Sequence, residues 1–177
     1  DTFGLSLTPS LRIADRNETR EVASVLQAGL NRYPGKSDLD TVDYAAHANA
    51  QWRFERDTLG LNLSAVRDST LQSELSETGI VHARRQREQF ELAPSWQHSP
   101  SETVTLRFDY KLSRVGYEDG SGLVDYENHS GSAGVSLALS ETLSVGVYAA
   151  ASRYEDRPGT VEATSKRLAA NVSYMPE

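Results

Sequence analysis

Charged side chains at alternate positions are the first feature of this chain that could carry chemistry. Within residues 103–113, single apolar residues separate Arg107, Asp109 and Lys111. In an extended strand, residues two apart share a face, so these three charges would stand side by side. Fixed charges of both signs on one surface can pair, hold water and select among charged solutes. Other segments would add further ionisable side chains to the same face: Arg53, Glu55, Glu91 and Arg167.

A basic run is the second such feature. Arg84, Arg85 and Arg87 lie close together, next to a long polar stretch. Guanidinium groups bind phosphate and carboxylate oxygens in pairs, so we expect these residues to contact a phosphate or another anion. The alternative is that these arginines lie in water where a loop joins the barrel and bind no ligand.

Metal binding and catalysis find little support in the sequence. The chain has no cysteine, and its four histidines have no partner at metal-ligand spacing. The acidic residues Glu118, Asp119, Asp125 and Glu127 could surround a calcium ion, but they lack the spacing of a known calcium loop. No nucleophile elbow or ordered Ser–His–Asp pattern is present. We therefore predict no metal, no cofactor, no catalytic residue and no enzymatic activity.

Extended strands are the elements that must position these charges. The apolar residues between the charges, from Val104 to Leu112, fall on the opposite face. This run fits the roughly 9–11 residues that a strand needs to cross a membrane. The same alternation predicts about nine strands. Pro9 and Pro94 interrupt two of them, and we place both near the end of the sheet that carries the short turns. The clearest other strands cover 3–13, 22–33, 44–55, 59–65, 90–97, 133–139, 143–151 and 167–174.

The connections between the predicted strands alternate in length. Short ones lie at 56–58, 100–103 and 140–142. Long polar ones cover 33–43, 68–88, 116–130 and 154–166. Short turns at one end and long loops at the other are typical of bacterial outer-membrane barrels.

The apolar face favours lipid over a protein core as its cover. It is thin at Ala46, Ala48 and Ala50, which fluid lipid tails tolerate better than a close-packed interior. Aromatic residues gather near strand ends, as the two membrane interfaces require. We predict one belt beside the short turns, of Trp52, Phe54, Trp96 and Tyr174, and another beside the long loops, of Tyr33, Tyr117, Tyr126 and Tyr154.

Several short segments resemble a known group of proteins. They are residues 30–34, 43–44, 56–61, 67–71, 74–75 and 78–79. They are similar to porin-like outer-membrane β-barrels of Gram-negative bacteria, of the type associated with exopolysaccharide or exosortase systems. The resemblance implies an architecture and brings no catalytic residues.

We thus expect an all-β fold, an antiparallel up-and-down transmembrane β-barrel in the bacterial outer membrane. Residues 1–177 would form a single domain and an incomplete barrel, lacking at least one strand. The barrel would pass or export polar solutes or polysaccharide through a polar lumen, and lipid and lipopolysaccharide would surround it. The alternatives are a soluble or surface-attached all-β binding module and a non-conducting scaffold barrel. The net charge of −7 argues against nucleic acid as a partner.

Overall fold

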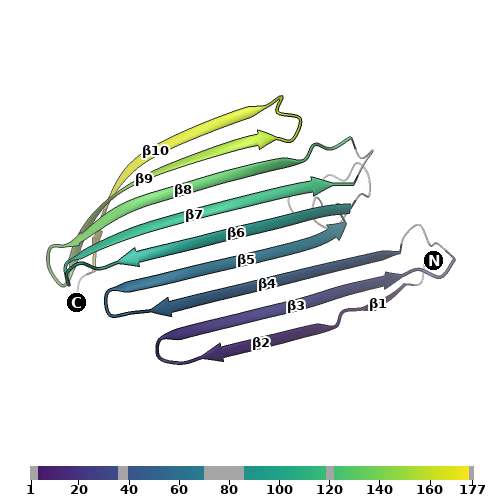
Figure 1. The fold of residues 1–177 in the computed structure, drawn as a ribbon, viewed down its shortest axis with the longest axis horizontal. Coiled ribbons are helices and arrows are strands. Elements are labelled where there is room, and N and C mark those ends of the chain that lie inside the picture. Colours follow the sequence, from purple (N-terminus) through teal and green to yellow (C-terminus); the bar gives the residue numbers. More distant parts are fainter. Residues whose placement is uncertain (1–3, 36–39, 70–85, 119–121, 176–177) are drawn as a thin grey trace.

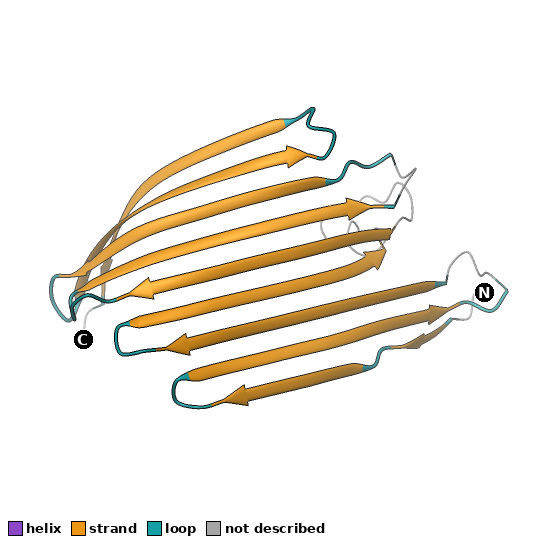
Figure 2. Cartoon of the chain, viewed as in Figure 1, coloured by secondary structure: helices purple, strands orange, loops and turns teal. Residues whose placement is uncertain are grey.

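A computed structural model describes residues 4–35, 40–69, 86–118 and 122–175, and these form one antiparallel sheet (Figures 1 and 2). From β3 onward, each strand pairs with the next along the chain, so the topology is up-and-down as predicted. None of the described residues forms a helix that could cross a membrane. The strands are β1 (Leu5–Leu7), β2 (Ser10–Arg16), β3 (Arg20–Arg32), β4 (Thr41–Arg53), β5 (Asp57–Ser69), β6 (Gln86–His98), β7 (Val104–Tyr117), β8 (Tyr126–Ala138), β9 (Leu143–Asp156) and β10 (Glu162–Tyr174).

Prolines interrupt the sheet within strands. Pro9 lies toward the end with the long connections, so its predicted place is wrong, whereas Pro94 lies in the half of β6 that leads to the short turn. The segment predicted as one strand over 3–13 is divided into β1 and β2 at Pro9, and both pieces pair with β3. The Pro9 carbonyl still accepts a hydrogen bond from the Ala28 N–H at 3.1 Å. At Pro94 the β6–β7 pairing is skipped and resumes in the same register at Ser95. Proline has no N–H to donate, which explains both interruptions.

The strand register gathers the apolar residues on one face of the sheet. Trp96 of β6 lies opposite Leu59 of β5 and Phe108 of β7. This row continues through Ala133 and Ala149 to Leu168 at the β10 edge. We call this side the apolar face. Because side chains alternate along a strand, the residues between them lie on the opposite side, which we call the polar face.

The apolar face has no protein cover among the described residues. Val115 is the one apolar side chain that they bury, whereas Phe108 is 42% and Leu168 is 76% exposed. A soluble sandwich or barrel would pack these side chains against a second layer or across an interior. Among the described residues the sheet is a single layer, and no second layer packs on its apolar face. Between Trp96 and Leu168, the small side chains of the row leave a hollow of about 1110 Å³, a shape that fluid lipid chains can fill.

The sheet is twisted and curved, and it does not close within the described residues (Figure 1). Its two edges, β1 with β2 and β10, lie at opposite sides of the view and do not pair with each other. The short turns and the C-terminus lie at the left, and the longer connections and the N-terminus lie at the right. The predicted difference between the two ends of the sheet is therefore present, except that the connection predicted over 154–166 covers 157–161 and is as short as the one at 99–103.

Candidate functional site

The polar face carries six of the seven residues predicted to line a lumen. Glu91 lies on β6, and Arg107, Asp109 and Lys111 follow one another at alternate positions of β7. Arg53 ends β4, and Arg167 lies on β10, both at positions of the polar face. Glu55 differs from the expectation. It lies in the turn between β4 and β5, beyond the last strand position, so it belongs to neither face.

Ion pairs neutralise most of the charge on the polar face. Lys111 Nζ lies 2.8 Å from Glu91 Oε1 on the neighbouring strand. Arg107 Nε lies 3.0 Å from an Asp109 oxygen two residues along the same strand. The Arg107 and Lys111 side chains remain 66% and 50% exposed, so water can reach the paired groups. Exposed pairs of this kind contribute little stability, and their main effect is a hydrated wall of balanced charge.

Arg167 takes no part in this pairing. No carboxylate among the described residues lies within ion-pair distance of its guanidinium group. Its Cζ atom instead lies 6.0 Å from the centre of the Tyr148 ring on β9. The position facing Arg167 across the β9–β10 pair is Ala150, which cannot hydrogen-bond to it. The polar face therefore carries one unneutralised positive charge at this place.

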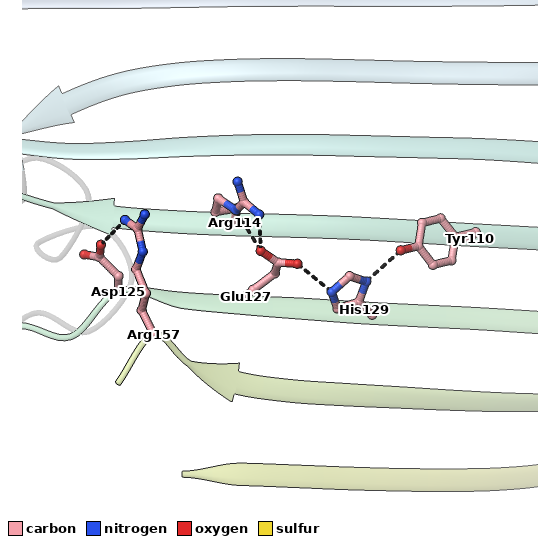
Figure 3. Close-up of polar contacts among 6 residues, drawn as sticks. All are labelled: Tyr110, Arg114, Asp125, Glu127, His129 and Arg157. Carbon is pink, nitrogen blue, oxygen red and sulfur yellow. Dashed lines mark hydrogen bonds and ion pairs between the residues drawn. The ribbon is translucent and has the colours of Figure 1, made fainter. Parts of the chain in front are cut away.

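A second group of polar side chains lies on the apolar face, near the end that carries the long connections (Figure 3). Arg114 Nε donates a hydrogen bond to Glu127 Oε2 at 2.7 Å. The other oxygen of Glu127 lies 2.6 Å from His129 Nε2. His129 Nδ1 lies 2.7 Å from the Tyr110 hydroxyl. We call this chain of contacts the outer-wall network; its members are Tyr110, Arg114, Glu127 and His129.

The chemistry open to the outer-wall network is proton exchange and hydrogen bonding to polar groups. When His129 Nε2–H donates to Glu127, Nδ1 can accept a hydrogen bond from the Tyr110 hydroxyl. The network borders a cavity of about 600 Å³, which Arg67 and Phe90 also line. In a barrel it would lie where the apolar band gives way to the lipid headgroups, because Arg114 follows the apolar positions of β7 and Glu127 precedes those of β8.

The sequence did not reveal the outer-wall network, although a signal for it exists. Tyr110 was assigned to the apolar face, Glu127 to a loop and His129 to scattered histidines. Arg114 continues the alternation of Tyr110 and Leu112, so the sequence places it on the same apolar face as these two residues. Only the register, which sets Arg114 opposite Glu127 and Leu112 opposite His129, brings the two strands together.

Asp125, one of the acidic residues considered as calcium ligands, is occupied by protein groups. The Tyr117 N–H donates to Asp125 Oδ1 at 2.8 Å. Arg157 Nη1 donates to Asp125 Oδ2 at 3.1 Å, the contact drawn in Figure 3. The hydrogen bond from Tyr117, followed by the contact with Arg157, holds the pKa of the Asp125 carboxyl below its ordinary value. Asp125 precedes β8 and thus ties three chain segments together outside the strands. The described residues contain no group of three potential metal ligands.

The aromatic residues divide between the two faces. Trp52 and Trp96 lie on the apolar face near the short turns, and Tyr174 lies there at the end of β10. Trp96 stacks on Phe108 with ring centres 5.3 Å apart and donates its indole N–H to Asp57 at 2.8 Å, the arrangement expected of a residue at an interface. Phe54 lies in the turn after β4, and Tyr33 follows the last residue of β3.

The belt predicted beside the long loops is wrong for three of its four tyrosines. Tyr117, Tyr126 and Tyr154 lie on the polar face, because the register places them level with Arg87, Val115 and Asn128. The Tyr126 and Tyr154 rings pack together with centres 5.4 Å apart. Distance from a strand end does not define a belt, since the face of the strand decides what a side chain meets.

Of the three arginines predicted to contact an anion, Arg87 is among the described residues. Arg84 and Arg85 lie outside the described residues. Arg87 lies on the polar face of β6, and its Nε and Nη2 atoms each donate to one oxygen of Asp68 at 3.1 Å. A guanidinium group that is held in this way and directed away from the apolar face does not suit the predicted contact with lipopolysaccharide phosphates.

Solved structures similar to this chain include two of an outer-membrane protein. The chain has a TM-score of 0.54 and 9% identity to OmpT (in-vitro folded), an outer membrane protein of Vibrio cholerae, and covers 94% of itself and 53% of that protein. The trimer form of OmpT gives a TM-score of 0.56 and 11% identity, with 94% and 54% covered. LpxR from Salmonella typhimurium gives 0.39 and 12%, with 98% and 78% covered. No protein-family model and no curated protein matches the chain.

These comparisons show the fold. The chain has the fold of bacterial outer-membrane β-barrels and spans about half the length of the OmpT structures. The predicted localisation agrees with these neighbours, which are outer-membrane proteins. The narrower association with exopolysaccharide or exosortase systems finds no support among them.

The prediction that the chain is not an enzyme is overturned. The similarity to outer-membrane β-barrels shows a fold, and a fold does not decide whether a protein is an enzyme. The error lay in treating the absence of a serine-hydrolase pattern in the sequence as evidence against all catalysis. A barrel can assemble acid–base groups from neighbouring strands, as the outer-wall network illustrates, and no linear motif records such an arrangement.

Proposed function

We propose that this sheet is part of the wall of an outer-membrane barrel and that small polar solutes cross the membrane along its polar face. The observation that carries the proposal is the separation of the two faces across the strands. One face presents a continuous apolar row from Trp52 to Leu168, and the other presents hydrated charges and hydroxyl groups. Lipid against the first face leaves the second one facing water.

Energetics support this orientation. The reverse arrangement would place Arg107 and Lys111 against lipid, at a cost of roughly 2–4 kcal/mol for each residue near the midplane. It would also leave the exposed Phe108, Val135 and Val147 in water. If the solute is a polysaccharide, the same polar face would line its path of export.

Conductance across planar bilayers tests the proposal. The full-length protein is reconstituted, and two tryptophan variants at neighbouring positions of β9 are compared. Ser152→Trp adds bulk to the polar face, whereas Ala151→Trp adds it to the apolar face. We expect stepwise ion currents from the parent protein, smaller steps from Ser152→Trp and unchanged steps from Ala151→Trp. A folded but silent parent protein would contradict passage and favour the non-conducting scaffold.

A further inference from the structure

The polar face contains a small region in which hydroxyl groups surround the unneutralised charge of Arg167. In one row, Ser165 of β10 faces Ser152 of β9, and Ser152 faces Ser130 of β8. The next row runs from Arg167 through Ala150 to Ser132. The sheet is hollowed here by about 450 Å³. The hollow is lined by Ser130, Ser132, Ser152, Ser165, Lys111 and Arg167.

Charge in this region does not balance. Lys111 is paired with Glu91, and Asp109, which also borders the hollow, is paired with Arg107. Arg167 has no such partner among the described residues and rests against the Tyr148 ring. The guanidinium group retains its N–H donors for a ligand, because an aromatic ring accepts through its face and occupies none of them fully.

Space for this arrangement comes from a glycine. Gly134 faces Tyr148 across the β8–β9 pair. A Cβ atom at this position would lie 3.1 Å from Tyr148 Cβ and 3.3 Å from the Val147 carbonyl oxygen. The missing side chain leaves room for Tyr148 Cβ, and the ring of this tyrosine contacts Arg167.

We propose that this hollow binds the anionic group of a small polyhydroxylated solute, with Arg167 as the charged contact and the serine hydroxyls as contacts for the hydroxyl groups of the solute. A carboxylate suits the planar donors of a guanidinium group. Hydroxyl groups both donate and accept, so a serine-lined surface matches a polyol better than an apolar or purely ionic solute. The inference rests on the proposed function, since it requires that water and solutes reach the polar face.

The chain offers a matched pair of variants for the test. Arg167 and Lys166 are adjacent cations on β10 that lie on opposite faces, because the register places Lys166 level with Ala151 of the apolar face. Arg167→Gln and Lys166→Gln therefore remove the same charge from the two sides. The full-length protein and both variants are reconstituted in planar bilayers. The chloride-to-potassium permeability ratio and the block of current by potassium gluconate are then measured, with neutral sorbitol as the control solute.

We expect gluconate to block the parent protein at lower concentration than sorbitol does. In Arg167→Gln, the half-blocking concentration of gluconate should rise about tenfold, the effect of losing one charged hydrogen-bonding partner. Lys166→Gln should behave as the parent does. Ser152→Ala should weaken the gluconate block and leave the chloride-to-potassium ratio unchanged, which separates hydroxyl recognition from charge. Equal gluconate block in the parent protein and Arg167→Gln, or equal losses in both glutamine variants, would overturn the proposal.

The failure of passage and the failure of binding are distinguishable. If the parent protein is silent, passage fails, and calorimetric titration of the detergent-solubilised protein with gluconate then tests the site alone. Binding that Arg167→Gln removes would uphold the site, and no binding to the parent would overturn it. Circular dichroism reports whether each variant retains its strand content. Arg167→Lys, which keeps the charge and loses the planar donors, replaces Arg167→Gln if that variant does not fold; an undiminished gluconate block in Arg167→Lys would contradict the planar contact.

Discussion

Arginine substitutions at two adjacent positions of β8 should have very different costs. Ala133 lies on the apolar face between Phe108 and Ala149, one residue from the middle of the strand. Ser132 lies on the polar face, where its hydroxyl donates to Asp109 at 3.4 Å. An arginine at Ala133 would meet lipid near the midplane, at a cost of roughly 2–4 kcal/mol, which corresponds to an about 30- to 700-fold change in the unfolding equilibrium. An arginine at Ser132 would meet water and a carboxylate, so we expect a change within about 1 kcal/mol.

Reversible denaturant unfolding of the full-length protein in lipid vesicles measures both free energies. A third variant, Ala133→Leu, distinguishes lipid from a protein core as the cover of the apolar face. Against fluid lipid the larger side chain only adds apolar area, so the stability should be unchanged or higher. In a close-packed interior it would cost about 1–3 kcal/mol. Equal costs for the two arginine variants, or a loss of more than about 1 kcal/mol for Ala133→Leu, would refute the reasoning.

Three further predictions concern packing, pH and the outer-wall network. Gly134→Ala should lower the free energy of unfolding by about 1 kcal/mol because the new Cβ would crowd Tyr148. Gly131→Ala should be neutral or stabilising, because the nearest atom to its Cβ is the Asp109 carbonyl oxygen at 3.8 Å. Equal effects of the two variants in the same unfolding assay would contradict this prediction. Because the pKa of Asp125 is lowered in the folded protein, its contribution to stability is complete above the unfolded-state pKa of about 3.9 and is lost as the pH falls below that value. Asp125→Asn should therefore flatten the dependence of the unfolding free energy on pH between about 5 and 3. An unchanged slope would count against the contacts of Asp125 with Tyr117 and Arg157. A double-mutant cycle of Arg114→Ala and Glu127→Ala in vesicles should give a coupling energy of about 0.2–1 kcal/mol, the range for exposed pairs, and additive effects would mean that the two side chains do not interact.

The fold could be predicted from the sequence because strand alternation and face assignment are local properties. Each strand from β3 to β10 overlaps a predicted run. The short turns predicted at 100–103 and 140–142 are present, whereas the one predicted at 56–58 lies at 54–56. The position of Pro9 along the sheet was predicted wrongly. A proline indicates that a strand loses a hydrogen bond, but it does not indicate how far that point lies from the short turns.

The site could be predicted only in part because it depends on register. The alternation of β7 was enough to place Arg107, Asp109 and Lys111 on one face. It could not show that Arg114 meets Glu127, or that Tyr126 and Tyr154 turn toward the polar side. Such relations join residues from different strands, and one residue of slip would reverse them all.

Measuring lipid and water contact residue by residue along β7 is the most direct test of the central claim. The chain contains no cysteine, so single cysteines introduced from Leu106 to Lys111 can carry spin labels at known positions. We predict an alternation with a period of two in vesicles. Labels at Leu106, Phe108 and Tyr110 should collide with lipid-dissolved oxygen, and labels at Arg107, Asp109 and Lys111 with a water-soluble nickel complex. Labels on the apolar residues that are shielded from both reagents would show a protein cover over that face and contradict the account.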